Sequence, residues 1–298
     1  MNKLPSTKQL RYFAALARHR HFGKAAEACF VSQPAFSIAI RELESVLNVQ
    51  LVDRTRKSVT ITSIGHDIAQ QARLVISDLE SLAALARENR ESLCGQLKLG
   101  VIPTVAPFIL PGLLPKLRRS HPALKLYLQE DLTQRLYRRL MEGELDLLLI
   151  ALPYALRNVK SMPLFKDPFY LAYRKDTGLF EPGHYSTAQL PPESVLLLED
   201  GHCLRDHALS ACRIRNVNKI SHISASSLLT LVQMVDADLG VTYLPEMARG
   251  SYLLKGTRVI TSPMKVQSYR EIGLVWRQGS RRDEEFRLFG KFIKDNHD

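Results

Sequence analysis

The sequence predicts an α/β protein in three parts: a winged helix-turn-helix (residues 1–62), a linker helix (63–94) and a two-lobed domain (95–298). Three observations predict this organisation. Short helical segments separated by a tight break open the chain. A stretch without proline follows from residue 63 to about residue 92, and strands and helices then alternate to the end. At roughly 100–200 residues per domain, a chain of 298 residues suits more than one compact body.

The first fifty residues have the pattern of a helix-turn-helix. Leu10, Phe13 and Leu16 recur at helical spacing, and a helix of small residues follows from residue 23 to residue 28. After a break of three residues a third helix begins, with Ser32 as its N-cap and Pro34 in its first turn. Two helices joined by so tight a turn place the second one in the major groove of DNA.

A basic hairpin is predicted after the third helix. Val59 and Ile61 alternate with threonines, as in a strand, and Arg54, Arg56 and Lys57 lie at the preceding turn. Residues 1–62 contain 10 Lys or Arg against 4 Asp or Glu. Such an excess also occurs on an ordinary solvated surface, but cations at the tip of a wing would contact phosphate or the minor groove.

The linker helix has a heptad pattern that favours dimerisation. Ile68, Val75 and Leu82 are seven residues apart, and Ala72 and Leu79 repeat the interval four residues later. This seam of about three heptads suits a dimer contact. The alternative is an amphipathic helix packed on its own chain. A two-fold dimer would match a palindromic operator, which favours the seam.

The runs AAEACFVSQPAFSIAIRELE and RTRKSVTITSIG resemble the helix-turn-helix and wing of the LysR-type transcriptional regulators. One departure concerns Ile38, Ala39 and Ile40, where that family often carries polar residues. Base reading is therefore expected to depend more on the start of the third helix and on the wing. The resemblance implies DNA contacts from Ser32, Gln33, Pro34, Ala35, Ser37, Arg41, Arg54, Arg56 and Lys57.

Strands and helices alternate in the remaining two hundred residues. The segments QLKLGVIP, LKLYL and LDLLLIA read as strands with helices between them, which predicts an α/β lobe on a largely parallel sheet. A second lobe is expected over residues 165–267, and residues 268–298 should return to the first lobe (95–164). The family resemblance implies two lobes like those of periplasmic binding proteins. Ligands of such sheets sit at the carboxyl ends of strands.

Cys203 stands out among the four cysteines. It follows a strand and a glycine turn, at what should be the start of a helix, where the helix dipole favours a thiolate. With His202 and Arg205 beside it, a lowered pKa is predicted. The alternative is inert packing, which is the expectation for Cys29, while Cys94 is given no role.

Cys212 follows Cys203 by nine residues. If residues 203–212 form one helix, the two cysteines stand on the order of 13 Å apart along its axis and point to opposite faces. A disulfide needs Cα atoms within about 7 Å, so a bond between them would require the helix to melt.

The segment EDGHCLRD, with a second cysteine nine residues after the first, resembles the hydrogen-peroxide-sensing members of the family, and IPTVAPFILP matches them too. The resemblance implies that Cys203 is the peroxidatic cysteine, oxidised to a sulfenic acid, and that Cys212 resolves it as a reversible disulfide. It also implies a peroxide pocket formed by Thr104, Thr133, His202, Arg205, Asp206 and Arg270.

Three other functions compete with this interpretation. Cys203 and His207 are four residues apart and could share a zinc ion, although a third ligand on that face is not evident. A regulator that binds a small organic effector in the crevice is the second alternative. A thiol peroxidase is the third, and the N-terminal DNA reader argues against it.

The expected partners are double-stranded DNA with a palindromic operator, hydrogen peroxide, RNA polymerase and further copies of the chain, as a homodimer or homotetramer. Family resemblance favours the tetramer. No P-loop or dinucleotide glycine pattern occurs, so no cofactor or metal is expected. Neither a signal peptide nor an apolar run of about 18 residues is found, which predicts a cytoplasmic protein without a membrane span.

Overall fold

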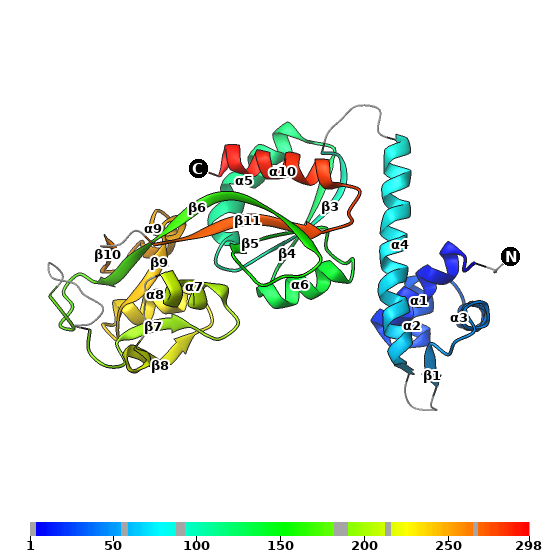
Figure 1. Ribbon diagram of the computed structural model, residues 1–298, viewed down its shortest axis with the longest axis horizontal. Helices are drawn as coiled ribbons and strands as arrows, with labels where there is room; N and C mark the ends of the chain where they lie inside the picture. Colours follow the sequence, from blue (N-terminus) through cyan, green and yellow to red (C-terminus); the bar gives the residue numbers. More distant parts are fainter. Residues whose placement is uncertain are drawn as a thin grey trace. The chain divides into compact units, whose positions relative to one another are not determined.

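The computed structural model describes residues 4–54, 59–87, 93–181, 190–211, 216–264 and 268–297. The chain divides into two compact units, one formed by residues 1–91 with 141–144 and the other by residues 92–140 with 145–298 (Figure 1). Three clusters of buried apolar side chains form the cores, one in the first unit and two in the second.

The first unit begins with the predicted helix-turn-helix, formed by α1 (Thr7–His19), α2 (Phe22–Ala28) and α3 (Gln33–Leu47). The Ser32 side chain accepts a hydrogen bond from the backbone N–H of Ala35, so the predicted N-cap is confirmed. Phe13, Leu16, Phe36 and Ile40 are fully buried in the core of this unit. The apolar face of α3 is therefore used for packing against the other helices, and its opposite face is free for other contacts.

The predicted wing is a short hairpin in which β1 (Val52–Arg54) pairs antiparallel with β2 (Val59–Ile61). The Glu44 carboxylate accepts hydrogen bonds from the backbone N–H groups of Leu51 and Val52, which ties the hairpin to α3. The Arg54 side chain and residues 55–58, which include Arg56 and Lys57, lie outside the described residues.

Helix α4 (Ser63–Arg87) follows the wing, as predicted. Ile68 packs against the core of the first unit, and Ala72 is buried. Val75, Leu79 and Leu82 are exposed. The proposed seam is thus divided: its first positions are engaged within the chain, and its later positions remain available to a partner.

The second unit is built on a mixed sheet with the strand order β10-β6-β11-β5-β3-β4, and β9 also pairs with β6. The parallel sheet predicted for the strands QLKLGVIP, LKLYL and LDLLLIA is confirmed, because β3 pairs parallel with both β4 and β5, but the sheet as a whole is mixed. Only β3 pairs parallel with β4 and β5, because β6 and β11 run back through the sheet antiparallel to their neighbours. The bounds are β3 (Gly95–Val101), β4 (Leu124–Glu130), β5 (Leu147–Leu152), β6 (Val159–Arg174), β9 (Thr242–Pro245), β10 (Val259–Pro263) and β11 (Tyr269–Arg277).

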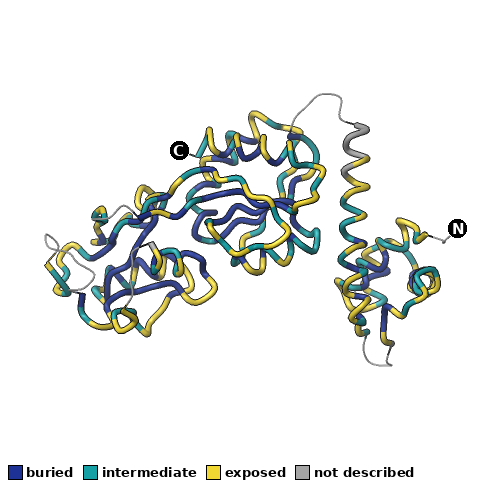
Figure 2. Tube along the Cα trace, viewed as in Figure 1, coloured by how far each residue is buried: buried dark blue, intermediate teal, exposed yellow. Residues whose placement is uncertain are grey.

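Lobe I is the part of the sheet around β3, β4 and β5. Helices α5 (Ala106–Ser120) and α10 (Asp283–Asn296) lie together on one face, and α6 (Thr133–Met141) lies on the other (Figure 1). The central strands β3 and β5 are buried along most of their length, whereas the edge strand β4 is partly exposed (Figure 2).

Lobe II contains a second, two-stranded sheet in which β7 pairs parallel with β8. Strand β6 runs through both lobes, pairing with β11 in its first part and with β9 and β10 in its second. The predicted lobe boundary at Phe165 therefore falls inside a continuous strand. The remaining elements are β7 (Val195–Leu198), α7 (Cys203–Ala211), β8 (Ile220–Ala225), α8 (Leu228–Asp236), α9 (Glu246–Arg249) and the 3-10 helices Val217–Lys219 and Tyr252–Leu254. None of the described helices is long and apolar enough to cross a membrane.

Candidate redox site and nucleic-acid surface

Cys203 is the first residue of α7 and is reached by the predicted strand and turn. Strand β7 ends at Leu198, and Gly201 then turns the chain in the left-handed region at φ +96°. Glycine adopts this conformation without steric cost, so the turn can deliver the helix start directly behind the strand. The Cys203 side chain is only 5% exposed.

Helix α7 is anchored in both cores of the second unit. Cys203 belongs to the apolar cluster of lobe I, whereas Leu204 and Ala208 belong to the cluster of lobe II. Neighbouring positions on a helix point about 100° apart, so one short helix can contact two bodies. Any change in α7 therefore alters the packing of both lobes.

A buried ion pair forms one side of the Cys203 site. Arg270 Nε donates to Asp167 Oδ2 at 2.9 Å, and both side chains are nearly inaccessible to solvent. Arg270 Nη1 donates to Thr104 Oγ1 at 2.9 Å, and Nη2 donates to the Thr104 carbonyl at 2.8 Å. The backbone N–H of Met247 donates to the other Asp167 oxygen. The guanidinium is thereby held rigidly, with its charge acting on the Cys203 sulfur.

Thr133 and Ala151 contact Cys203 from lobe I. Both the Thr133 hydroxyl and the Ala151 backbone favour the thiolate form of Cys203 by hydrogen bonding. Beyond its contact with the sulfur, Thr133 Oγ1 has no hydrogen-bond partner among the described residues, although it is fully buried. Thr104 follows β3, and Thr133 follows β4. The polar groups thus gather at the carboxyl ends of the parallel strands, where ligands of such sheets bind.

The predicted lowering of the Cys203 pKa was wrong in its net direction. Burial raises the pKa of this thiol, and Arg270, Thr133 and the Ala151 backbone oppose the rise without overcoming it. The sequence showed a helix start with cations nearby, but it could not show that the sulfur lies in an apolar core. A thiolate has to be desolvated there, which disfavours the charged form.

His202 and Arg205, predicted to help the thiolate, point elsewhere. Arg205 Nε pairs with Asp200 at 2.9 Å, and Nη1 donates to the Leu198 carbonyl at 3.1 Å. His202 contacts the backbone of Ser226, and burial lowers its pKa. Asp206 is exposed, and its charge raises the pKa of Cys203 instead of supporting the thiolate.

Two neighbours of the site were not assigned to the peroxide pocket from sequence. His207 Nε2 lies 3.1 Å from the Pro153 carbonyl, while Nδ1 is buried and has no hydrogen-bond partner among the described residues. Burial lowers the pKa of His207. Tyr154 is close enough to Cys203 and Asp206 for their charges to raise its pKa, after burial as the main cause. The interval of four residues between Cys203 and His207, which is also the spacing of two zinc ligands, is the sequence signal for their proximity.

Cys212 directly follows the last residue of α7 and lies outside the described residues. Within the described ranges, Cys29 and Cys203 are free thiols. Burial raises the pKa of the half-buried Cys29, in keeping with a packing role. In the same part of the chain, no group of three or more His, Cys, Asp or Glu side chains is arranged to hold a metal ion.

The predicted DNA-contacting side chains form the outer surface of α3. Ser32, Gln33, Pro34, Ala35 and Arg41 are exposed, and Ser37 is half-buried. The Gln33 side chain lies over α2, where a Cβ on Gly23 would come within 3.4 Å of Gln33 Oε1. The first turn of α3 is thus presented outward as a recognition helix requires.

Comparison with known proteins agrees with this architecture. The family model described as "Bacterial regulatory helix-turn-helix protein, lysR family" matches residues 7–66, and the "LysR substrate binding domain" matches residues 90–298. The chain is 38% identical to the HTH-type transcriptional regulator EstR of Acinetobacter baylyi, over 99% of this chain and 98% of the relative. It is 39% identical to a hydrogen peroxide-inducible genes activator of Escherichia coli, over 92% and 90%. A full-length OxyR variant from Pseudomonas aeruginosa superposes with a TM-score of 0.81 at 32% identity, covering 99% and 96% of the two chains.

Proposed function

The chain belongs to the LysR family of bacterial transcriptional regulators, and from this premise we propose that it is an OxyR-type sensor of hydrogen peroxide. The observation that carries the proposal is the set of buried groups around the Cys203 thiol. A single thiol begins a helix between two lobes, and the buried groups that act on it are a guanidinium, a hydroxyl and a backbone amide. A small molecule with two oxygens is the ligand that these donors suit.

The buried Thr133 hydroxyl beside the Cys203 sulfur supports a peroxide at this position. Apart from its contact with the Cys203 sulfur, a weak acceptor, this buried hydroxyl has no partner among the described residues, so a bound oxygen that pairs with it would be stabilised. Arg270 is held by Asp167 and Thr104 before any ligand arrives. Its charge can stabilise the hydroxide that forms when the O–O bond breaks.

The proposed chemistry uses two thiols and one peroxide. The Cys203 sulfur attacks one peroxide oxygen, the O–O bond breaks, and the departing hydroxide takes up the thiol proton as water. This leaves a sulfenic acid. The Cys212 thiol then attacks the Cys203 sulfur, a second water leaves, and a disulfide forms. The two sulfurs are oxidised and the peroxide is reduced, without a metal or cofactor. Each oxidation consumes one peroxide, so we propose a sensor and not a turnover enzyme.

Disulfide formation would exclude the present form of α7. The helix runs from Cys203 to Ala211, which puts its ends on the order of 12 Å apart along the axis. A disulfide between Cys203 and the residue after Ala211 needs Cα atoms within about 7 Å. Oxidation would therefore unwind α7, and the lobe surfaces it joins would rearrange.

We propose that the output of this rearrangement is a change in DNA binding. A dimer formed through the exposed Val75, Leu79 and Leu82 would place two recognition helices on a palindromic operator. We also propose that the protein assembles into a tetramer, contacts RNA polymerase and is located in the cytoplasm.

Mass spectrometry of thiol states before and after dilute hydrogen peroxide tests the sensor directly. We expect the wild-type chain to lose two thiols, with one bond joining Cys203 and Cys212. Cys203→Ser should lose the reaction, and Cys212→Ser should stop at a sulfenic acid that a dimedone probe traps. Cys29→Ser and Cys94→Ser are the matched controls and should oxidise like the wild type. Oxidation confined to the control cysteines would refute the proposal.

A regulator that responds to a small organic effector is the second candidate, favoured by the near full-length match to EstR. A promoter fusion carrying the wild-type regulator would separate the two candidates by its dose response. Under the peroxide proposal the response follows peroxide and is lost in Cys203→Ser. A response to an organic compound that survives in Cys203→Ser would instead indicate that the regulator binds an organic effector.

A further inference from the structure

Ile38, Ala39 and Ile40 form the apolar run of α3 that departs from the family pattern, and they differ in burial. Ala39 and Ile40 lie in the core of the first unit, so their apolar character is explained by packing. Ile38 is 49% exposed and faces the other way. Ile38 is not part of the buried cluster of this unit, so the core does not require an isoleucine there.

Ile38 shares its exposed surface with other residues expected at DNA. Pro34 and Arg41 lie four residues before it and three residues after it, so all three stand on one face of the helix. Ala35 is exposed beside Pro34. The resulting surface is apolar at its centre, with Arg41 at one end beside Glu42, whose carboxylate accepts a hydrogen bond from Gln9. We name this surface, made of Pro34, Ala35, Ile38 and Arg41, the reading face.

We propose that Ile38 is a specificity-determining residue that recognises thymine methyl groups in the major groove. The proposal rests on the proposed DNA-binding function and adds the kind of base that the helix selects. Thymine carries the only methyl group on the major-groove edges of the four bases, and apolar side chains recognise it by contact. Isoleucine has no hydrogen-bonding group with which to read any other base edge.

The position of the reading face identifies DNA as its occupant. The opposite face of α3 is filled by Phe36, Ile40 and Leu43, so the reading face is the one that a helix-turn-helix turns to the groove. The surrounding chain is basic, with 10 Lys or Arg against 4 Asp or Glu in residues 1–62, which complements a polyanion. Arg41 on the same face can reach a phosphate or a guanine edge.

Deoxyuridine substitution tests this contact without changing any other base feature, because uracil differs from thymine only by the methyl group. Full-length protein would first select its preferred duplexes from a random-sequence library. Each thymine of the selected duplex is then replaced singly by deoxyuridine, and the Kd is measured. We expect about fourfold weaker binding for each contacted methyl, as for one buried carbon group.

The decisive comparison is the same set of duplexes with Ile38→Ala. At the thymine that contacts Ile38, deoxyuridine replacement should no longer weaken binding by this variant, because the methyl group has lost its partner. At every other thymine the replacement should weaken binding as it does for the wild type. Leu288→Ala on α10 is the matched control, since Leu288 is 43% exposed but lies in the second unit. The Leu288→Ala variant should bind the selected duplex with the wild-type Kd, and each deoxyuridine replacement should weaken its binding as much as it weakens that of the wild type. Circular dichroism checks that Ile38→Ala remains folded.

The outcomes separate the two proposals. If wild-type protein selects no sequence and binds all duplexes equally, the proposed function as an operator-binding regulator fails. If it selects an operator but no thymine shows a penalty, or Ile38→Ala keeps the full wild-type pattern, only the role of Ile38 is overturned. A changed oligomeric state of Ile38→Ala in ultracentrifugation with an unchanged pattern would assign the reading face to a subunit contact instead.

Discussion

Asp167→Asn should destabilise the second unit strongly, because it leaves the Arg270 guanidinium buried without its counter-ion. The Arg270 and Asp167 side chains are 0% and 3% exposed, and Nε and Oδ2 are 2.9 Å apart. Removing one partner of such a pair typically costs about 3–5 kcal/mol. For a body of this size, 1 kcal/mol moves the melting temperature by roughly 2–4 °C. We therefore expect a decrease of about 10 °C.

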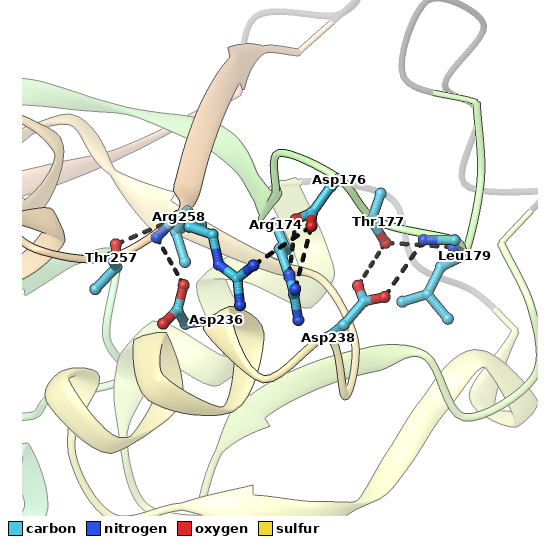
Figure 3. A network of polar contacts seen from close by, with 10 residues as sticks. Arg174, Asp176, Thr177, Leu179, Asp236, Asp238, Thr257 and Arg258 are labelled. Atoms are coloured by element: carbon cyan, nitrogen blue, oxygen red, sulfur yellow. Dashed lines mark hydrogen bonds and ion pairs between the residues drawn. The ribbon is translucent and has the colours of Figure 1, made fainter.

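The single tryptophan makes this measurement specific. Trp276 is fully buried on β11, so its fluorescence reports the unfolding of the second unit alone. Asp176→Asn is the matched control for the chemical change (Figure 3). Asp176 pairs with Arg174 at 2.7 Å, but its side chain is 56% exposed. Water screens such a pair, so the control should melt close to the temperature of the wild type.

A double variant identifies the cause of the loss. Asp167→Leu combined with Arg270→Met replaces both charges with apolar groups, and such replacements are often neutral or stabilising. We expect most of the melting temperature to return while the reaction with peroxide does not. Equal decreases for Asp167→Asn and Asp176→Asn, or a double variant less stable than Asp167→Asn, would refute the reasoning from burial.

Three further predictions concern single side chains. Thr133→Val should stabilise the protein by about 1 kcal/mol in tryptophan-monitored melting, because it removes a buried hydroxyl whose one partner among the described residues is the weakly hydrogen-bonding Cys203 sulfur. It should also raise the pKa of Cys203, measured as slower alkylation at neutral pH. Phe30→Asn should stabilise the first unit by about 0.5–1 kcal/mol in hydrogen exchange, because Phe30 is 95% exposed at φ +55° and asparagine tolerates that region better. Burial lowers the pKa of His207 below its ordinary value, so the neutral form adds stability above about pH 6.5 that is lost as the pH falls. His207→Gln should therefore melt with less pH dependence from about pH 7 to pH 5.5, and an unchanged slope would contradict this.

The local elements were predictable because their signals are local. Ser32 and Pro34 mark the start of α3 through capping and a fixed φ, and both act within one turn of the helix. The alternation of Val59 and Ile61 reports a strand, whichever partner it pairs with. The start of α7 at Cys203 follows from the strand and glycine before it.

Sequence reasoning failed where the answer depended on contacts between distant segments. The return of residues 268–298 to lobe I was predicted, but the antiparallel position of β11 between β5 and β6 joins residues more than a hundred positions apart, and no local pattern encodes that pairing. Asp167 reads as an ordinary surface aspartate, yet it is the counter-ion of Arg270. Arg205 is near Cys203 in the chain but is turned about 200° away on the helix, so proximity in sequence misassigned it.

The raised pKa of Cys203 and the double anchorage of α7 bear on the proposed redox switch. The neutral thiol suits an apolar core, so the reduced helix is stabilised by the same burial that suppresses its reactivity toward large oxidants. Packing of Leu204 in the core of lobe II adds about 2 kcal/mol to the folded helix. To convert a population that is 99% in one form to 99% in the other, oxidation must supply about 5.5 kcal/mol. Leu204→Ala should lower that requirement without touching the sulfur. Accelerated hydrogen exchange across residues 204–211 of the reduced variant, with an unchanged alkylation rate of Cys203, is the expected signature. If exchange stays slow, the anchorage in lobe II does not hold the reduced helix in place.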